Sequence, residues 1–314
     1  MDVTGKLAEP DLTPFHGQRL HIGSVLIPFD DVHPRTRLVD QDARGAVLFI
    51  ESVTPAGAHV HGTAFLVAPG IALTAWHTIS AWEEEGHFGE PDHAIFACGA
   101  IGAELRVWEV RSINGPVAGG DVAMLILAPR FELGEEVAVY HFALAAAFPG
   151  VGSHVTALGM RLEPAEAVLP LLHGDLQLPV ISIATVVSTG AVEDRYPKGI
   201  PRIAAPCLAA NVFSIGGMSG GPVFDETGHV VGIVSESIGN DDVDDYVTFV
   251  SLIWPATLFE FEGVWPQGLL PAGSTLRDAY VRDGWRVFAT TAGELAFLEG
   301  GSPDFIGPPN FAQG

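Results

Sequence analysis

The chain has little cysteine, with only Cys98 and Cys207 among its 314 residues. So few cysteines exclude a disulfide-rich scaffold of the kind that holds small secreted domains together, and they indicate a reducing compartment. The first 30 residues also lack the continuous apolar core after a basic start that a signal peptide requires. We therefore predict a cytoplasmic protein.

Basic residues are scarce as well. The chain carries 15 Lys and Arg against 38 Asp and Glu, which gives a formal net charge of −23. A chain this acidic repels nucleic acid and anionic membrane surfaces, and no stretch approaches the ~18 uninterrupted apolar residues of a membrane span. We predict neither nucleic-acid nor membrane partners. The charge favours neutral or basic substrates, although it equally suits solubility alone.

Short apolar segments are what the sequence has in quantity. Hydrophobic residues make up 48% of the chain, enough for a large core, and from about residue 45 they form short runs without helical periods between them. This pattern predicts an all-β protein with closed or sandwiched antiparallel sheets. An Ala/Pro/Gly-rich stretch over residues 143–152 divides the runs into two series. The expected strands are residues 46–51, 62–67, 71–74, 94–98, 105–110 and 122–127, then 155–158, 180–187, 207–212, 223–224, 230–235 and 246–250.

One glycine-rich stretch stands out. Residues 216–222 read Gly-Gly-Met-Ser-Gly-Gly-Pro, so that Ser219 lies between two glycine pairs with an apolar run behind it. Glycines around one hydroxyl let a substrate approach closely, and they free N–H groups to converge on a developing oxyanion. Taken alone, the stretch is equally well explained as an ordinary glycine-rich turn.

Two segments upstream change that balance. His77 ends the run Ile-Ala-Leu-Thr-Ala-Trp-His, and Asp121 opens the run Asp-Val-Ala-Met-Leu-Ile-Leu. The chain order His, Asp, Ser is that of the chymotrypsin arrangement. All three segments resemble the trypsin/chymotrypsin-like serine protease family, of the bacterial and disulfide-poor type. Its motifs there are Thr-Ala-Ala-His, Asp-Ile-Ala-Leu-Leu and Gly-(Asp/Asn)-Ser-Gly-Gly-Pro.

The resemblance covers roughly residues 45–262 and implies a fold. The family has two six-stranded antiparallel β-barrels, expected here at about residues 45–142 and 153–262, with the active site between them and a short closing helix near residues 251–261. Residues 1–44 and 263–314 are then terminal extensions that the resemblance does not explain. It also places Cys98 and Cys207 in different barrels, so we expect free, buried thiols.

The resemblance further implies a role for each motif residue. Ser219 would be the nucleophile, His77 the base that activates it, and Asp121 the acceptor of the imidazole's other N–H. The backbone N–H groups of Gly217 and Ser219 would form the oxyanion hole. Secreted members of the family carry an aspartate immediately before the serine, which holds a newly freed amino terminus. This chain has Met218 there, so we expect the hole to form without amino-terminal processing.

Substrate preference follows from the same resemblance. Phe213 would lie at the floor of the primary pocket, Ser235, Glu236 and Ser237 would form a wall that pairs with the substrate backbone, and Asp245 would lie on the opposite wall. A Phe floor argues against strict selection of Lys or Arg and favours small or medium apolar groups. Asp245 would accept a basic side chain, although its acidic run is at least as well explained as an exposed loop.

Other histidines do not predict a metal site. His59 and His61 share one face of an expected strand, and His87 and His93 follow, but a zinc site needs three or four converging ligands. With 12 histidines in the chain, chance clustering is the better account. We predict no metal and no cofactor.

These residues predict a serine endopeptidase that acts on protein or peptide substrates through an acyl-enzyme. We expect an intracellular enzyme with a regulatory or defence-associated role, open to control by a regulatory protein partner. Two alternatives stay open at this point. One is a catalytically silent scaffold or binding protein on the protease fold, and the other is an esterase that uses the same triad.

Overall fold

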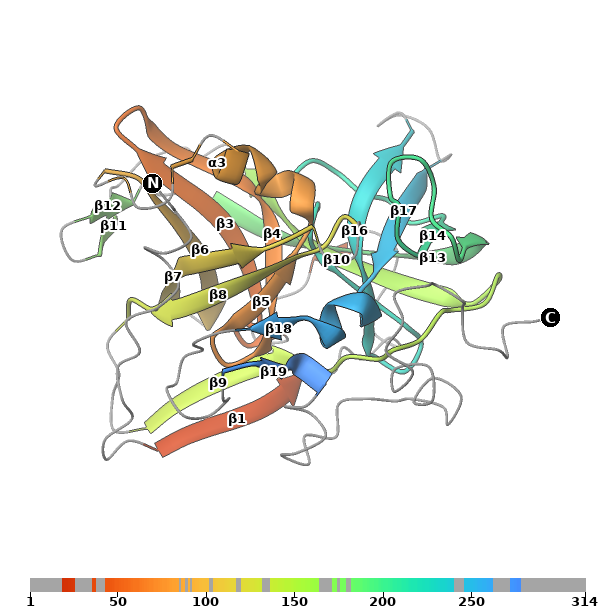
Figure 1. Ribbon diagram of the computed structural model, residues 1–314, viewed down its shortest axis with the longest axis horizontal. Coiled ribbons are helices and arrows are strands. Elements are labelled where there is room, and N and C mark those ends of the chain that lie inside the picture. Colours follow the sequence, from red (N-terminus) through yellow and green to blue (C-terminus); the bar gives the residue numbers. More distant parts are fainter. Residues whose placement is uncertain are drawn as a thin grey trace.

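Most of the chain between residues 43 and 261 is described by the computed structural model. The described residues are 19–25, 36–37, 43–84, 86–87, 90, 92–101, 104–116, 120–131, 136–163, 171–173, 176–178, 182–239, 246–261 and 272–277. Two groups of strands dominate the molecule, one coloured orange to yellow and the other green to blue (Figure 1).

The first group is a closed barrel. Its strands follow one another around the barrel in the order β3-β4-β5-β8-β7-β6, and every neighbouring pair is antiparallel. Apolar residues favour closure, since the first four residues of β3 and the first three of β5 are apolar and buried. The bounds are Val47–Thr54 (β3), Gly57–Ala68 (β4), Ile71–Thr74 (β5), Ala94–Ile101 (β6), Glu104–Asn114 (β7) and Ala123–Pro129 (β8).

The second group also closes on itself. Its strands follow the order β10-β15-β16-β17-β14-β13, and an antiparallel pairing of β10 with β13 completes the ring. Strand β2 (Thr36–Arg37) adds to β13 from outside. The bounds are His154–Glu163 (β10), Ser182–Tyr196 (β13), Cys207–Ala210 (β14), Pro222–Phe224 (β15), Val230–Ile238 (β16) and Val247–Leu252 (β17).

The two barrels share a core. Phe142 is fully buried and its ring lies 6.2 Å from that of Phe65 in the first barrel and 5.1 Å from that of Phe224 in the second. Ring pairs at these separations gain attraction beyond the area that they bury. The contacts hold the barrels against each other, which a site assembled from both of them requires.

Some short elements lie outside the barrels. Strand β1 (Arg19–Val25) pairs in parallel with β9 (Glu136–Phe142), and the two lie side by side below the first barrel in Figure 1. Two hairpin-like pairs complete the strands, β11 (Leu171–His173) with β12 (Leu176–Leu178) and β18 (Glu260–Phe261) with β19 (Ser274–Thr275). The helices of at least three residues within the described ranges are η2 (Trp76–Thr78), α3 (Ser80–Glu84) and η4 (Trp254–Leu258). In the described part of the chain, none of them has the length and apolar character of a transmembrane helix.

The predicted fold class is confirmed, with differences at the edges. The sequence analysis assigned no strands to β1 or β9, because their pairing joins segments more than a hundred residues apart. The expected closing helix is a five-residue 3₁₀ helix that begins at Trp254, since residues 251 and 252 still belong to β17 and Pro255 suits the first turn of a helix but not its interior. Cys98 and Cys207 are free and buried, as predicted, and lie in different barrels.

Glu51 is a buried carboxyl on β3 and predicts an unusual pH dependence of stability. It is 1% exposed, and its Oε1 forms no hydrogen bond among the described residues. Burial raises the pKa of Glu51 from 4.5 to about 7. A carboxyl whose pKa is raised on folding stabilises the protein fully below pH 4.5, and that contribution is lost as the pH rises through 7. We expect the loss to be on the order of 3 kcal/mol.

A neutral isostere isolates this effect. The free energy of unfolding of Glu51→Gln should match the wild type near pH 5 and exceed it near pH 8, as measured by urea denaturation at both pH values. Glu104→Gln, at an exposed carboxylate of the same barrel, is the control and should show the same difference from wild type at both. A Glu51→Gln difference that does not change with pH contradicts the prediction.

Candidate active site

His77 lies in the short 3₁₀ helix η2, immediately after β5. Two threonine hydroxyls fix this turn. The Thr78 hydroxyl donates to the Ala75 carbonyl (2.7 Å), and the buried Thr74 hydroxyl donates to the Thr63 carbonyl (2.7 Å) on the neighbouring strand. The turn therefore holds His77 at the end of a rigid strand while leaving 47% of its side chain exposed.

Asp121 meets His77 through both carboxylate oxygens. Oδ2 lies 2.7 Å from His77 Nδ1, and Oδ1 accepts the backbone N–H of His77 at 2.9 Å. The Asp121 side chain is only 13% exposed, so water screens the pair weakly. Two contacts to one residue fix both the place and the orientation of the imidazole ring, and they direct Nε2 away from the carboxylate.

The loop that carries Ser219 comes from the second barrel and is bound to the first by Thr63. The Thr63 N–H donates to the Ser219 carbonyl (2.8 Å), and its hydroxyl donates to the Gly217 carbonyl (2.6 Å). The same hydroxyl accepts the N–H of Met160 at 2.8 Å. Sequence analysis missed Thr63, since a strand threonine gives no local sign that it bridges two barrels.

Glycine is required where this loop meets the His77 turn. Gly220 has a φ of +82°, and a Cβ there would lie 2.2 Å from the Thr63 carbonyl oxygen and 2.7 Å from the Ala75 nitrogen. A Cβ on Gly62 would lie 2.8 Å from the Ser219 carbonyl oxygen. Neither position has room for a side chain. The close approach places Ser219 beside the turn that holds His77.

Two N–H groups of the loop are available to a ligand. Gly217 has a φ of +97°, a conformation that favours glycine, and its carbonyl is held by Thr63. Among the described residues, neither Gly217 N–H nor Ser219 N–H donates a hydrogen bond. The Ser219 hydroxyl likewise forms no hydrogen bond with His77 within the described residues. Two such donors, one at the serine and one two residues before it, are the kind of group that stabilises an oxyanion.

Met218 lies in the interior. It is fully buried in the core of the second barrel, and a Cβ on Gly159 would clash with its side chain. Burial of this apolar side chain anchors the loop that carries Ser219. An aspartate buried at the same position would need a charged partner.

A cleft of about 440 Å³ opens beside His77 and Asp121. Its far side is formed by the second barrel, through Ser235, Glu236 and Arg202. Glu236 forms an ion pair with Arg202, which is 74% exposed, so both charges of the pair lie along the cleft. The cleft is therefore lined by residues of both barrels.

The structure brings together only part of the predicted substrate pocket. Ser235 and Glu236 line the cleft, whereas the Ser237 hydroxyl lies 3.2 Å from that of Thr248 on β17. Phe213 is not among the cleft-lining residues. The Tyr246 ring packs edge-on against it with centroids 4.7 Å apart. Asp245 lies outside the described residues.

The four histidines singled out from the sequence fall into two unrelated places. On β4 the rings of His59 and His61 meet edge-on at 4.9 Å, and His61 Nε2 lies 2.7 Å from the Ser52 hydroxyl. Burial, followed by the charge of His59, lowers the pKa of His61 to about 4, so the ring is neutral near pH 7. His87 and His93 lie in the loop between α3 and β6, together with Glu90, which the sequence analysis did not consider.

The family model described as "Trypsin-like peptidase domain" matches residues 62–233, more than half of the chain. The match includes His77, Asp121 and Ser219. No curated protein sequence matches the chain.

Several solved structures are similar at low identity. Deg5 is 18% identical with a TM-score of 0.43, covering 67% of this chain and 84% of that one. The MamO protease domain from Magnetospirillum magneticum is 16% identical with a TM-score of 0.40, covering 67% of this chain and 93% of that one. The HtrA-type protease AlgW, solved with a decapeptide, is 14% identical with a TM-score of 0.44, covering 68% of this chain and 64% of that one.

Proposed function

The chain belongs to the trypsin-like peptidase family, and from this premise we propose that it is a serine endopeptidase in which Ser219 is the nucleophile. His77 is the general base, and Asp121 orients it. The observation that carries the proposal is the double contact of Asp121 with His77. With Nδ1 facing the carboxylate, Nε2 is the ring nitrogen that accepts a proton from the nucleophile.

The reaction then proceeds in two halves. His77 Nε2 takes the hydroxyl proton of Ser219 as Oγ bonds to the carbonyl carbon of the substrate, and the carbonyl oxygen becomes an oxyanion. The N–H groups of Gly217 and Ser219 stabilise that charge. The C–N bond breaks as Nε2 passes its proton to the leaving amine, which leaves an ester on Ser219. A water that loses its proton to Nε2 hydrolyses the ester, and Ser219 regains its proton.

The Ser219 hydroxyl and His77 form no hydrogen bond among the described residues, and this does not argue against the scheme. Catalytic hydrogen bonds are often long or poorly aligned in the free enzyme and shorten when substrate excludes water. Thr63 fixes the backbone of the Ser219 loop at Gly217 and Ser219 themselves, so the N–H donors need little rearrangement.

The substrate is a protein or peptide with a small or medium apolar group at the cleaved position. This preference rests on the family resemblance, which places Phe213 at the floor of the primary pocket, and the Tyr246 ring packs edge-on against Phe213. The backbone of β16 at Ser235 and Glu236 lies along the cleft, where an extended peptide would pair with it. Free thiols at Cys98 and Cys207 support a cytoplasmic location, and burial raises the pKa of both, which keeps them unreactive.

An active-site serine probe tests the proposal directly. A fluorophosphonate forms an Oγ–P bond to an activated serine as the P–F bond breaks, and the hydroxyl proton passes to the base. We expect the wild type to be labelled at Ser219, as read by mass spectrometry of the modified peptide. His77→Ala should abolish labelling, whereas Ser153→Ala, in the turn between the barrels, should label like the wild type.

The alternatives give different results. A folded wild type that is not labelled indicates a silent scaffold and overturns the proposal. Labelling together with turnover of ester but not peptide substrates indicates an esterase. Profiling of peptides cleaved from a proteome-derived library separates these outcomes and defines the cleavage preference.

A further inference from the structure

A second cluster of reactive side chains lies outside the cleft, in the loop that joins α3 to β6. His87, Glu90 and His93 occur at intervals of three residues. Backbone hydrogen bonds link the three residues, since the Glu90 N–H donates to the His87 carbonyl (3.3 Å) and the His93 N–H donates to the Glu90 carbonyl (3.2 Å). These bonds hold the three residues close together.

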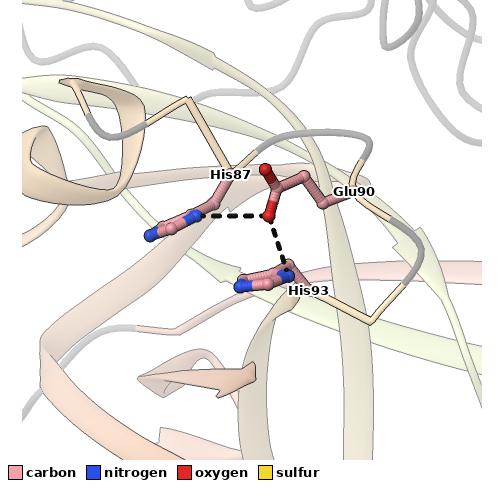
Figure 2. A group of neighbouring side chains, drawn as sticks. All are labelled: His87, Glu90 and His93. Carbon is pink, nitrogen blue, oxygen red and sulfur yellow. Dashed lines mark ion pairs between the residues drawn. The ribbon is translucent and has the colours of Figure 1, made fainter. Parts of the chain in front are cut away.

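The three side chains converge on one point. Glu90 Oε2 lies 3.5 Å from His87 Nδ1 and 3.0 Å from His93 Nδ1. Figure 2 shows the carboxylate between the two rings, with both ion pairs dashed. One potential ligand atom from each residue lies within 4.8 Å of the other two. The two imidazole rings are stacked, with centroids 4.6 Å apart and an interplanar angle of 14°, so both Nδ1 atoms face the same carboxylate.

The spacing fits a transition-metal ion. Ligand atoms about 2.0–2.1 Å from a tetrahedral zinc ion lie roughly 3.3 Å from one another. The two observed distances to Glu90 Oε2 lie on either side of that value. His93 Nδ1 is buried and forms no hydrogen bond among the described residues. A ring nitrogen that faces a carboxylate oxygen without a hydrogen bond between them is an arrangement that a shared cation would satisfy.

We propose that His87, Glu90 and His93 form a binding site for a divalent transition-metal ion, with zinc as the ion that two imidazoles and one carboxylate suit best. The protein supplies three ligands, and water completes the coordination. The site revises the expectation of no metal, which considered the histidines without Glu90. It is independent of the proposed triad.

The Trp82 ring packs against one side of the proposed metal site. This α3 residue is 4% exposed, and its ring lies 5.0 Å from that of His87 and 6.0 Å from that of His93. The apolar ring shields the site on one side, while the Glu90 side chain, 49% exposed, leaves the other side open to solvent and to an entering ion. Because α3 follows directly on the η2 turn of His77, a bound ion would tie the α3–β6 loop down beside the active-site segment.

Metal titration tests the site. Protein dialysed against EDTA and then freed of chelator is titrated with Zn²⁺ by calorimetry and with Co²⁺ by visible absorption. We expect one strongly bound ion per chain and, for Co²⁺, the visible bands of a four-coordinate nitrogen and oxygen site. Glu90→Gln and His93→Gln should each lower the affinity by about 100-fold or more. Zn²⁺ at 100 times its Kd should raise the Tm of the wild type by on the order of 5 °C, and that of Glu90→Gln far less.

Two matched variants exclude other histidines as the source of binding. His59→Gln removes one ring of the other histidine pair, and His77→Ala removes the only imidazole paired with Asp121 among the described residues. Both should bind Zn²⁺ like the wild type. The proposal is overturned if the wild type binds no Zn²⁺ in the micromolar range, if Glu90→Gln binds it equally well, or if His59→Gln or His77→Ala abolishes binding.

Discussion

Ser219→Ala is expected to lower kcat for peptide hydrolysis by about six orders of magnitude, and His77→Ala by a similar factor. The two residues act as a unit, because the hydroxyl is a poor nucleophile without the base and the base has no role without the hydroxyl. The double variant should therefore lose no more activity than either single one. Measurements of kcat and KM on one peptide substrate for all four proteins check this.

The kinetic comparison requires that each variant is correctly folded. Ser219 forms its contacts with Thr63 through backbone atoms, so Ser219→Ala should keep the Tm of the wild type. Ser153→Ala serves as the kinetic control and should retain full activity. The assignment is wrong if the Ser219→Ala protein still hydrolyses peptides at the wild-type rate. It is also wrong if the loss of kcat in the double variant equals the product of the losses in the two single variants.

Asp121→Asn has the next largest expected effect, a loss of roughly four orders of magnitude in kcat. The structure gives the reason in detail. Oδ1 accepts the backbone N–H of His77, so the amide oxygen of an asparagine must occupy that position. Its NH₂ group then faces Nδ1, which lies 2.7 Å from the other carboxylate oxygen in the wild type. Nδ1 becomes an acceptor, Nε2 carries the proton, and the ring no longer accepts one from Ser219.

The measurement separates this tautomer effect from general damage. The Asp121→Asn protein should unfold at a Tm close to that of the wild type, because the size and the backbone contact of the side chain are kept. Its rate of labelling by a fluorophosphonate should fall in parallel with kcat, because both reactions need the same proton transfer. Less than tenfold loss in a folded protein argues against a catalytic role for Asp121.

Several features could be predicted from the sequence because they are local. The motif residues His77, Asp121 and Ser219 lie at the ends of apolar strands or between glycines, and such short-range patterns are visible in any single segment. The strand-rich, helix-poor pattern likewise predicted an all-β fold, because each barrel strand carries its own apolar run. Several strands came out shorter than observed, whereas the predicted strand 207–212 is longer than β14. β13 extends to Tyr196 and β7 to Asn114, because pairing with a neighbouring strand prolongs a strand beyond its apolar residues.

Other features depend on contacts between distant segments. Thr63 lies 154 residues from Gly217, and nothing near it in the chain indicates that its hydroxyl fixes the Ser219 loop. The predicted specificity residues show the same limit. Phe213 was placed by its distance from Ser219, but it is not among the residues that line the cleft, and the Tyr246 ring packs edge-on against it.

The sequence by itself determined the fold class and the three motif residues, since backbone constraint and strand periodicity are encoded within a few neighbouring positions. Only the tertiary structure decided which groups meet. Barrel closure sets Thr63 against the Ser219 loop and leaves the cleft between the barrels. Backbone hydrogen bonds among His87, Glu90 and His93 bring Glu90 between two histidines that the sequence left unconnected. The physical reason is that hydrogen bonds and metal ligation require separations of about 2–3 Å, and the packing of whole elements sets distances on that scale.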